Sequence, residues 1–252
     1  MQKRYRIEQN SVCFDYNSWA NKQFKNDYDW RRTLLVWKAE RLASLVPTGI
    51  HFPSALEIGA AEGIVIKRLG ELLHIERCLA VDISQAFLSC GKRHYPNITF
   101  IHYNGSNLPI RDKSIDLIIL SDIIEHISDL DSLFKEVRRV GKYALLKVPL
   151  DRYAWRKLVS APLGRSFQVG PGHPDGHLHE FSKKSLERLL KKFGLEILNS
   201  KVVYRPISRS EDYRTKKGIL KARWYLDSKL KQLFPQIAHK ILGGDFIAFL
   251  LL

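Results

Sequence analysis

The chain has 252 residues, enough for one α/β domain with appended segments and a substantial buried core. Its 45% hydrophobic content excludes a disordered chain, and no stretch approaches the roughly 18 consecutive apolar residues of a membrane-spanning helix. The formal net charge of +15 favours anionic partners over cationic ones. Three cysteines without the paired spacing of a metal site predict reduced thiols in a cytoplasmic protein.

The first segment, residues 1–50, is expected to form a cap that is rich in aromatic side chains and ends in a helix. Apolar residues at Leu35, Ala39, Leu42 and Val46 recur with the spacing of one helix face. The turn-forming sequence that follows them ends the expected helix.

Residues 51–252 alternate apolar runs with amphipathic segments. Continuous apolar strands separated by helices predict an α/β fold with a mostly parallel sheet covered on both faces. Helices are expected at residues 65–73, 130–137 and 186–193, with Ser128 as the N-cap of the second. The expected strands are Ala55–Ile58, Cys78–Ile83, Ile98–Tyr103, Ile115–Leu120, Tyr143–Val148, Glu196–Val203 and Phe246–Leu251.

Two long segments interrupt this alternation, at about residues 151–180 and 204–244. Long connections in compact domains tend to be functional, so both are predicted to be substrate-side insertions. The second includes a basic amphipathic helix near 219–233, which packs on the domain or meets a partner or a membrane surface. Residues 183–231 hold fifteen Lys and Arg against five Asp and Glu, which indicates either an anion-binding surface or a solvated basic face.

The strongest functional signal is the sequence ALEIGAAEG at residues 55–63, at a predicted strand-to-helix turn. Its glycines allow a tight turn and close approach of a ligand, and the helix that follows offers unpaired N–H groups. Asp82 ends the second strand, where an acidic side chain accepts hydrogen bonds from two ribose hydroxyls. A nicotinamide dinucleotide site would need glycines at positions 61 and 64, where this chain has Ala61 and Ile64.

A second stretch identifies a family. Residues 103–127 read YNGSNLPIRDKSIDLIILSDIIEHI, which is similar to the D-A-x-x-L-P-F-x-D-x-S-F-D pattern and E-H pair of class I S-adenosylmethionine-dependent methyltransferases. The resemblance covers about residues 52–150 and is to the type-11-like, small-molecule branch. It implies a Rossmann-like, three-layer α/β/α sandwich with a seven-stranded, mostly parallel sheet whose last strand is antiparallel.

The same resemblance implies S-adenosylmethionine as the cofactor and assigns its contacts. The first turn surrounds the methionine part, the second strand's acid holds the ribose, the third strand's end borders the adenine, and the fourth strand's tip lies beneath the sulfonium. Asparagine replaces the usual aspartate beside the adenine, but its side-chain carbonyl still accepts a hydrogen bond. The implied cofactor-binding residues are Glu57, Gly59, Ala61, Gly63, Asp82, Asn104, Gly105 and Ser121.

Methyl transfer from a sulfonium is an in-line displacement, so the protein mainly aligns the acceptor and excludes water. A hydroxyl acceptor must also lose a proton. His126 and His179 are the candidate general bases, and His173 and His177 share the second one's loop. The alternative is structural: Glu125 and His126 cap the next helix, and the loop histidines are surface residues.

Asp122, Glu125, His126 and His179 also look like the E-x-x-E-H…H-x-F pattern of metal-assisted 2′-O-methyltransferases of small RNA. Such a set could hold a divalent ion that acidifies a hydroxyl. Aspartate replaces the first glutamate, however, and E-H pairs occur widely without metal. No metal is therefore included in the prediction.

The sequence thus predicts methyl transfer to a small-molecule, lipid-linked or glycan acceptor, at oxygen. An RNA methyltransferase that uses the basic segment at 183–231 is one alternative. A cofactor-binding partner subunit without catalysis is another, and a peripheral membrane contact stays open.

Overall fold

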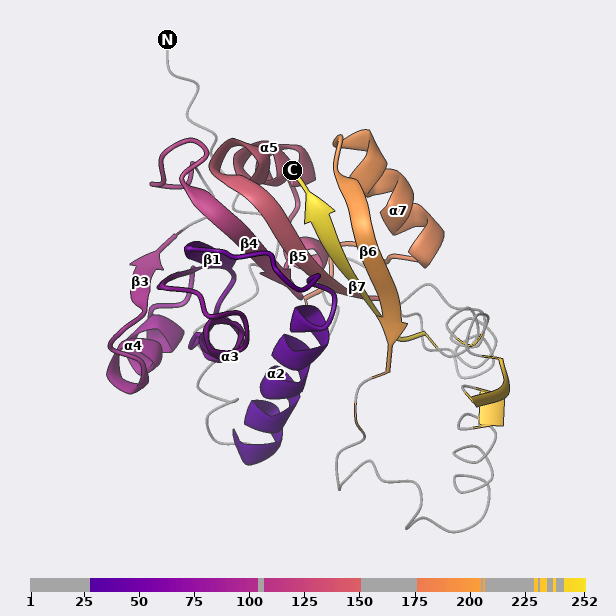
Figure 1. Cartoon of the computed structure of the whole chain (residues 1–252), viewed down its shortest axis with the longest axis horizontal. Coiled ribbons are helices and arrows are strands. Elements are labelled where there is room, and N and C mark those ends of the chain that lie inside the picture. Colours follow the sequence, from indigo (N-terminus) through magenta and orange to yellow (C-terminus); the bar gives the residue numbers. More distant parts are fainter. Residues whose placement is uncertain are drawn as a thin grey trace.

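The computed structural model describes residues 28–103, 107–150, 176–204, 206, 229–230, 232–234, 238 and 243–252. Within them, one seven-stranded sheet has the strand order β3-β2-β1-β4-β5-β7-β6 (Figure 1). The strands are β1 Ser54–Ile58, β2 Arg77–Asp82, β3 Thr99–His102, β4 Ile115–Ser121, β5 Gly141–Pro149, β6 Glu196–Val203 and β7 Asp245–Leu251. The helices are α2 Tyr28–Ala43, α3 Ile64–Leu73, α4 Gln85–His94, the 3-10 helix η1 Ile124–His126, α5 Leu130–Val140 and α7 Lys183–Lys192.

The sheet confirms the predicted fold class. All seven expected strands are present, each within two residues of its expected bounds. Strands β1 to β5 pair in parallel, whereas β7 runs antiparallel to both β5 and β6. Every residue of β1 is buried, as expected of a parallel strand that is covered on both faces.

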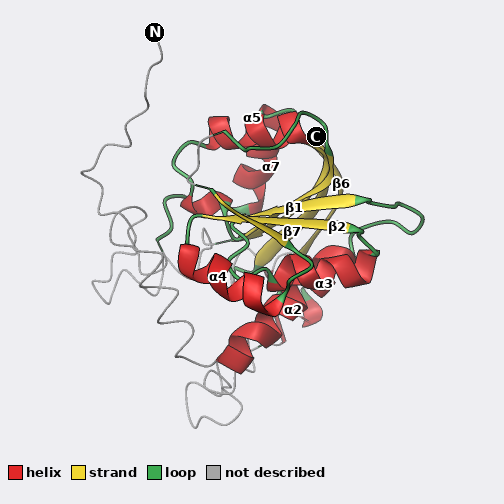
Figure 2. Ribbon diagram, turned by 90° about the vertical axis from the view of Figure 1, so that its left-hand side faces the viewer, coloured by secondary structure: helices red, strands yellow, loops and turns green. Residues whose placement is uncertain are grey.

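The two faces of the sheet pack against different helices. Figure 2 shows α5 and α7 on one side and α2, α3 and α4 on the other. Because side chains alternate along a strand, Leu56 joins the apolar cluster that contains Phe134 of α5, while Ala55 joins the cluster that contains Leu42 of α2. These two clusters make the sandwich three layers thick.

Two local expectations need correction. Helix α4 was not expected, because only four of its ten residues are buried and its sequence is otherwise polar; the Ser84 side chain caps it by accepting from the Phe87 N–H. The N-cap of α5 is Asp129 rather than Ser128, because the helix starts one residue later and Asp129 accepts from the Ser132 N–H at 2.9 Å. Both differences concern only where a single helix lies along the chain, and neither changes the order of the strands.

Much of the two expected insertions lies outside the described residues. This holds for 151–175, with His173, and for most of 205–242, including most of the helix expected near 219–233. Within the described residues, no helix combines the length and apolar character that crossing a bilayer requires.

Helix α2 is joined to the rest of the domain by a buried ion pair. Its Arg31 donates through both guanidinium NH₂ groups to Glu62, with one N–O distance of 2.8 Å. Only 2% of the Glu62 side chain is exposed, and the Arg31 guanidinium also lies over the Phe87 ring, 5.2 Å from its centroid. The first turn after β1, where Glu62 lies, is therefore held against α2.

Replacing Arg31 tests this pair. Arg31→Ala leaves the buried Glu62 carboxylate unpaired, so we expect the free energy of unfolding to fall by about 3–5 kcal/mol in urea titrations. Adding Glu62→Gln should recover part of the loss. Lys67→Ala, which breaks the exposed pair with Glu71 on α3, is the control and should change stability little. Equal losses for the Arg31 and Lys67 variants would contradict the structure.

Candidate active site

The candidate site lies where the sheet changes its direction of winding. Strand β1 has β2 on one side and β4 on the other, so the chain leaves β1 toward one edge of the sheet and returns at β4 to build the opposite edge. Ligands of open α/β sheets bind outside the carboxyl ends of the strands at such a point. The predicted residues at the ends of β1, β2 and β4 are therefore brought together.

The turn between β1 and α3 requires glycine at its start. Gly59 has φ +72°, and a Cβ atom on it would lie 2.5 Å from the Ile123 Cδ1 atom, so a larger residue would collide. The Gly59 N–H donates to the Val81 carbonyl of β2 at 2.9 Å. Gly63, with φ +80°, precedes α3 and gives that helix no side-chain cap. The N-terminus of α3 is accordingly suited to polar ligand groups.

Asp82 ties the tip of β2 to this turn. One of its oxygens accepts from the Ala61 N–H at 2.7 Å and the other from the Ser84 N–H at 2.8 Å. The first bond holds Ala61 at φ +48°, a left-handed conformation that costs a non-glycine residue about 1 kcal/mol or more. Burial raises the pKa of the Asp82 carboxyl, although the backbone donors oppose the shift. A carboxylate has about four lone-pair directions, so this one can still accept from hydroxyls.

Glu57 is buried beneath the same turn. Its side chain accepts from the Ile66 N–H of α3 at 3.0 Å, which links β1 to the first turn of that helix. Burial raises its pKa to about 8, with the nearby Asp82 adding to the shift. Its predicted contact with the ammonium group of a ligand stays a prediction.

A charged network that the sequence did not reveal lies at the tip of β4. Asp122, at φ +55°, is paired with Lys147 of β5 and, at 2.5 Å, with Lys38 of α2. Lys147 also donates to Asp245 of β7 at 3.0 Å. Burial alone would raise the pKa of Asp122, but the two ammonium groups hold it well below its usual range. Helix α2 thus reaches the fourth strand as well as the first turn.

The histidines near the tip of β4 make two kinds of contact. His179 Nε2 bonds the Ile127 carbonyl at 2.9 Å, so this ring is attached to backbone. The His126 ring lies edge-on to that of His177, with centroids 4.9 Å apart, and its Nδ1 bonds the Gly176 carbonyl at 3.2 Å. His126 lies in η1, before the N-cap of α5, so the expectation that it caps that helix is wrong.

Three predicted residues remain to be placed. Ser121 is the last residue of β4 and is half-buried, at the expected strand tip. Asn104 and Gly105 lie outside the described residues, so their place beside an adenine stays a prediction.

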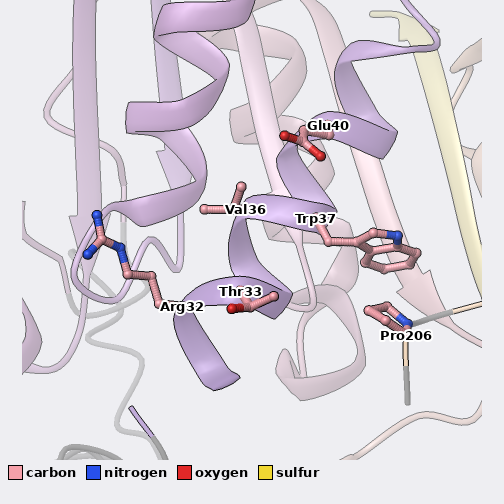
Figure 3. A pocket seen from close by; sticks show the side chains of 6 residues that line it. All are labelled: Arg32, Thr33, Val36, Trp37, Glu40 and Pro206. Atoms are coloured by element: carbon pink, nitrogen blue, oxygen red, sulfur yellow. The ribbon is translucent and has the colours of Figure 1, made fainter. Parts of the chain in front are cut away.

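A separate pocket of about 470 Å³ lies along α2 (Figure 3). In this view the Trp37 indole lies beside Pro206. None of the predicted cofactor-binding residues lines it. Its lining residues are Arg32, Thr33, Val36, Trp37, Glu40 and Pro206.

The buried Glu57 carboxyl predicts a pH dependence of stability. Between its usual pKa of 4.5 and the folded value of about 8, the folded chain keeps a proton that the unfolded chain releases. This stabilising contribution is complete below pH 4.5 and is lost as the pH rises through 8, by about 1.4 kcal/mol per pH unit. Glu57→Gln should therefore lose less stability than the wild type between pH 5 and 8, measured by urea unfolding without added ligand.

Glu71→Gln is the matched control. Glu71 is on the surface of α3, and its hydrogen bond with Lys67 lowers its pKa, so its contribution changes only at more acidic pH. This variant should follow the wild-type pH profile. Parallel profiles for wild type and Glu57→Gln would show that the Glu57 pKa is not raised.

Comparisons with known proteins agree with this geometry. A family of methyltransferase domains, Methyltransf_11, matches residues 56–143. An S-adenosylmethionine-dependent methyltransferase of Mycolicibacterium smegmatis is 26% identical over 172 residues, which are 67% of this chain and 62% of that protein. The demethylmenaquinone methyltransferase of Chlamydia pneumoniae is 28% identical over 163 residues, 59% of this chain and 69% of the relative. The match to the first relative thus spans less than two thirds of its length.

The fold is also similar to that of a solved methyltransferase. The crystal structure of a SAM-dependent methyltransferase from Archaeoglobus fulgidus superimposes with a TM-score of 0.56, at 15% identity, over 94% of this chain and all of that one. The resemblance inferred from the sequence is confirmed by the family match, the relatives and the fold. Residues 56–143 thus match the methyltransferase-domain family, and the chain has the fold of the class I, Rossmann-like methyltransferases.

Proposed function

We propose that the chain transfers the methyl group of S-adenosylmethionine to a hydroxyl oxygen of a small-molecule, lipid-linked or glycan acceptor. The single observation that carries the proposal is the β1–α3 turn, where Asp82 holds the Ala61 N–H and Gly59 packs against Ile123. These two contacts bring the ends of β1, β2 and β4 together.

The residues around this point fit the cofactor. Asp82 keeps acceptor capacity for ribose hydroxyls, and the start of α3, whose N-cap Gly63 makes no side-chain cap, offers backbone donors beside the turn. Gly59 has no side chain, which lets the turn lie directly against Ile123 after β4. Bound S-adenosylmethionine supplies an activated methyl group, so the chain's own work is to align the acceptor with it and exclude water.

The acceptor's proton would go to the side chains that follow β4. His126 donates its Nδ1–H to the Gly176 carbonyl, so Nε2 is the basic nitrogen of this tautomer. As the hydroxyl oxygen bonds to the methyl carbon and the carbon–sulfur bond breaks, this nitrogen is the proposed base. His179, the other candidate, bonds the Ile127 carbonyl through Nε2, so we propose that it anchors the loop.

Two observations bear on the class of acceptor. The Chlamydia pneumoniae relative is named for demethylmenaquinone, which favours a lipid-like small molecule. The described part of the basic segment includes α7, whose sequence KKSLERLLKK has five cationic residues and one acidic residue. An anionic group on the acceptor would fit this surface, and so would RNA, the alternative.

The test is transfer of a radiolabelled methyl group into separated lipid, glycan, small-molecule and RNA fractions. We expect label in a non-RNA fraction, bound as a methyl ether. Asp82→Ala removes two hydrogen bonds that hold the turn and the proposed ribose contact, so transfer should fall about 10- to 100-fold or more. Asp131→Ala, on the exposed surface of α5, is the control and should transfer normally.

Other outcomes of the same experiment contradict the proposal. Label in RNA alone, with binding that weakens steeply as salt rises, would make the chain an RNA methyltransferase. Cofactor binding without label in any fraction would make it a partner subunit. Undiminished transfer by Asp82→Ala would show that the cofactor does not bind at the end of β2.

A further inference from the structure

A carboxylate and two imidazoles converge next to the tip of β4. Glu125, His126 and His177 each place one potential metal-binding atom within 4.8 Å of the other two. Nitrogen and oxygen ligands of one tetrahedral zinc ion are about 3.4 Å apart, so the three side chains would have to rotate by a small amount to bind one ion. It differs from the set expected from the sequence: His177 replaces His179, which bonds the Ile127 carbonyl, and Asp122 is engaged by two lysines.

The Glu125 carboxyl is buried without a hydrogen-bond partner. Only 1% of the residue is exposed, and neither side-chain oxygen has a partner among the described residues. A buried polar group left in this state destabilises the folded chain, and more so when it is charged. Burial, reinforced by the nearby Asp122, raises its pKa well above its usual value. The carboxyl therefore points to a ligand that would pair with it.

The backbone holds the three side chains together. The Leu178 and His179 N–H groups both donate to the Glu125 carbonyl, at 2.7 and 3.1 Å, which fixes the segment containing His177 against η1. The His126 Nδ1–H donates to the Gly176 carbonyl, which fixes the orientation of the ring. Histidines that bind metals usually donate their other N–H to a carbonyl or carboxylate in this way.

The neighbouring charges do not oppose a cation. Lys38 and Lys147 are the nearby cations in the electrostatic environment of Glu125, and both are paired with Asp122. Lys147 is also paired with Asp245. The two lysines and two aspartates sum to zero charge, so an ionised Glu125 would leave the cluster net negative.

We propose that Glu125, His126 and His177 form a binding site for one divalent transition-metal ion of the zinc class. Two imidazoles and one carboxylate are typical ligands of such ions and are poorly suited to magnesium, which prefers oxygen. Three protein ligands leave a coordination position open. If the acceptor is a hydroxyl, as the proposed function holds, an ion here would acidify it, and its proton would pass to water instead of to His126. Binding of the ion itself does not depend on that function.

The test is metal titration of the untagged, full-length chain after removal of metals with a chelator and without cofactor. Zn²⁺ binding is measured by calorimetry, and Co²⁺ binding by the visible absorption of a four- or five-coordinate ion. We expect one ion per chain. His177→Ala and Glu125→Gln should each weaken binding by at least about 10- to 100-fold, because losing a ligand should cost no less than losing a supporting residue.

Two controls separate this site from other histidines. His179→Gln keeps a donor for the Ile127 carbonyl and should bind as tightly as the wild type, as should His51→Ala at the exposed surface. Thermal unfolding without metal verifies that each variant is folded. His177→Ala removes a partly exposed side chain, so it remains usable if Glu125→Gln does not fold.

Equal metal affinity of the wild type and His177→Ala would overturn the proposal. So would the absence of one-to-one binding, or a loss confined to His179→Gln. Because no cofactor is present in the titration, a negative result leaves the methyl-transfer proposal standing. Conversely, a chain that binds zinc but transfers no methyl group would leave the metal site standing.

Discussion

The reversal of winding between β1 and β4 is the constraint on which the site depends. Parallel strands with right-handed connections send the chain from β1 to one face of the sheet and from β4 to the other, which opens a crevice between their ends. The turn after β1 must then pass close to the turn after β4. Gly59 lies against Ile123 there, and glycine suits both its positive φ and the lack of room for a Cβ atom.

Around this crevice the chain buries an unusual amount of charge. Paired charges, such as Lys147 with Asp122 and Asp245, are costly to bury and tend to be replaceable by apolar residues where only stability matters. Glu57 and Glu125 are buried with raised pKa values and few or no partners. Such groups cluster at functional sites because a ligand, rather than the fold, completes their interactions. Helix α2 takes part in this arrangement, since it pairs with Asp122 through Lys38.

The sheet and the position of the β1–α3 turn could be predicted because their signals are local. Buried parallel strands are continuous apolar runs, and the positions of Gly59 and Asp82 at strand ends follow from those runs. Contacts between distant segments could not be predicted, because Arg31 and Glu62 look like ordinary surface charges in sequence. The choice of His177 over His179 depends on the backbone's path: the peptide N–H groups of residues 178 and 179 bind Glu125, and only the structure shows which ring then faces it.

The most direct measurement is a calorimetric titration of the purified chain with S-adenosylmethionine, with its demethylated product S-adenosylhomocysteine, and with NADH as the rival ligand of the same fold type. The account predicts one-to-one binding of the first two and none of the third, since Ala61 and Ile64 stand where a dinucleotide site needs glycine. Absence of heat with both adenosyl ligands, or tighter binding of NADH, would contradict it.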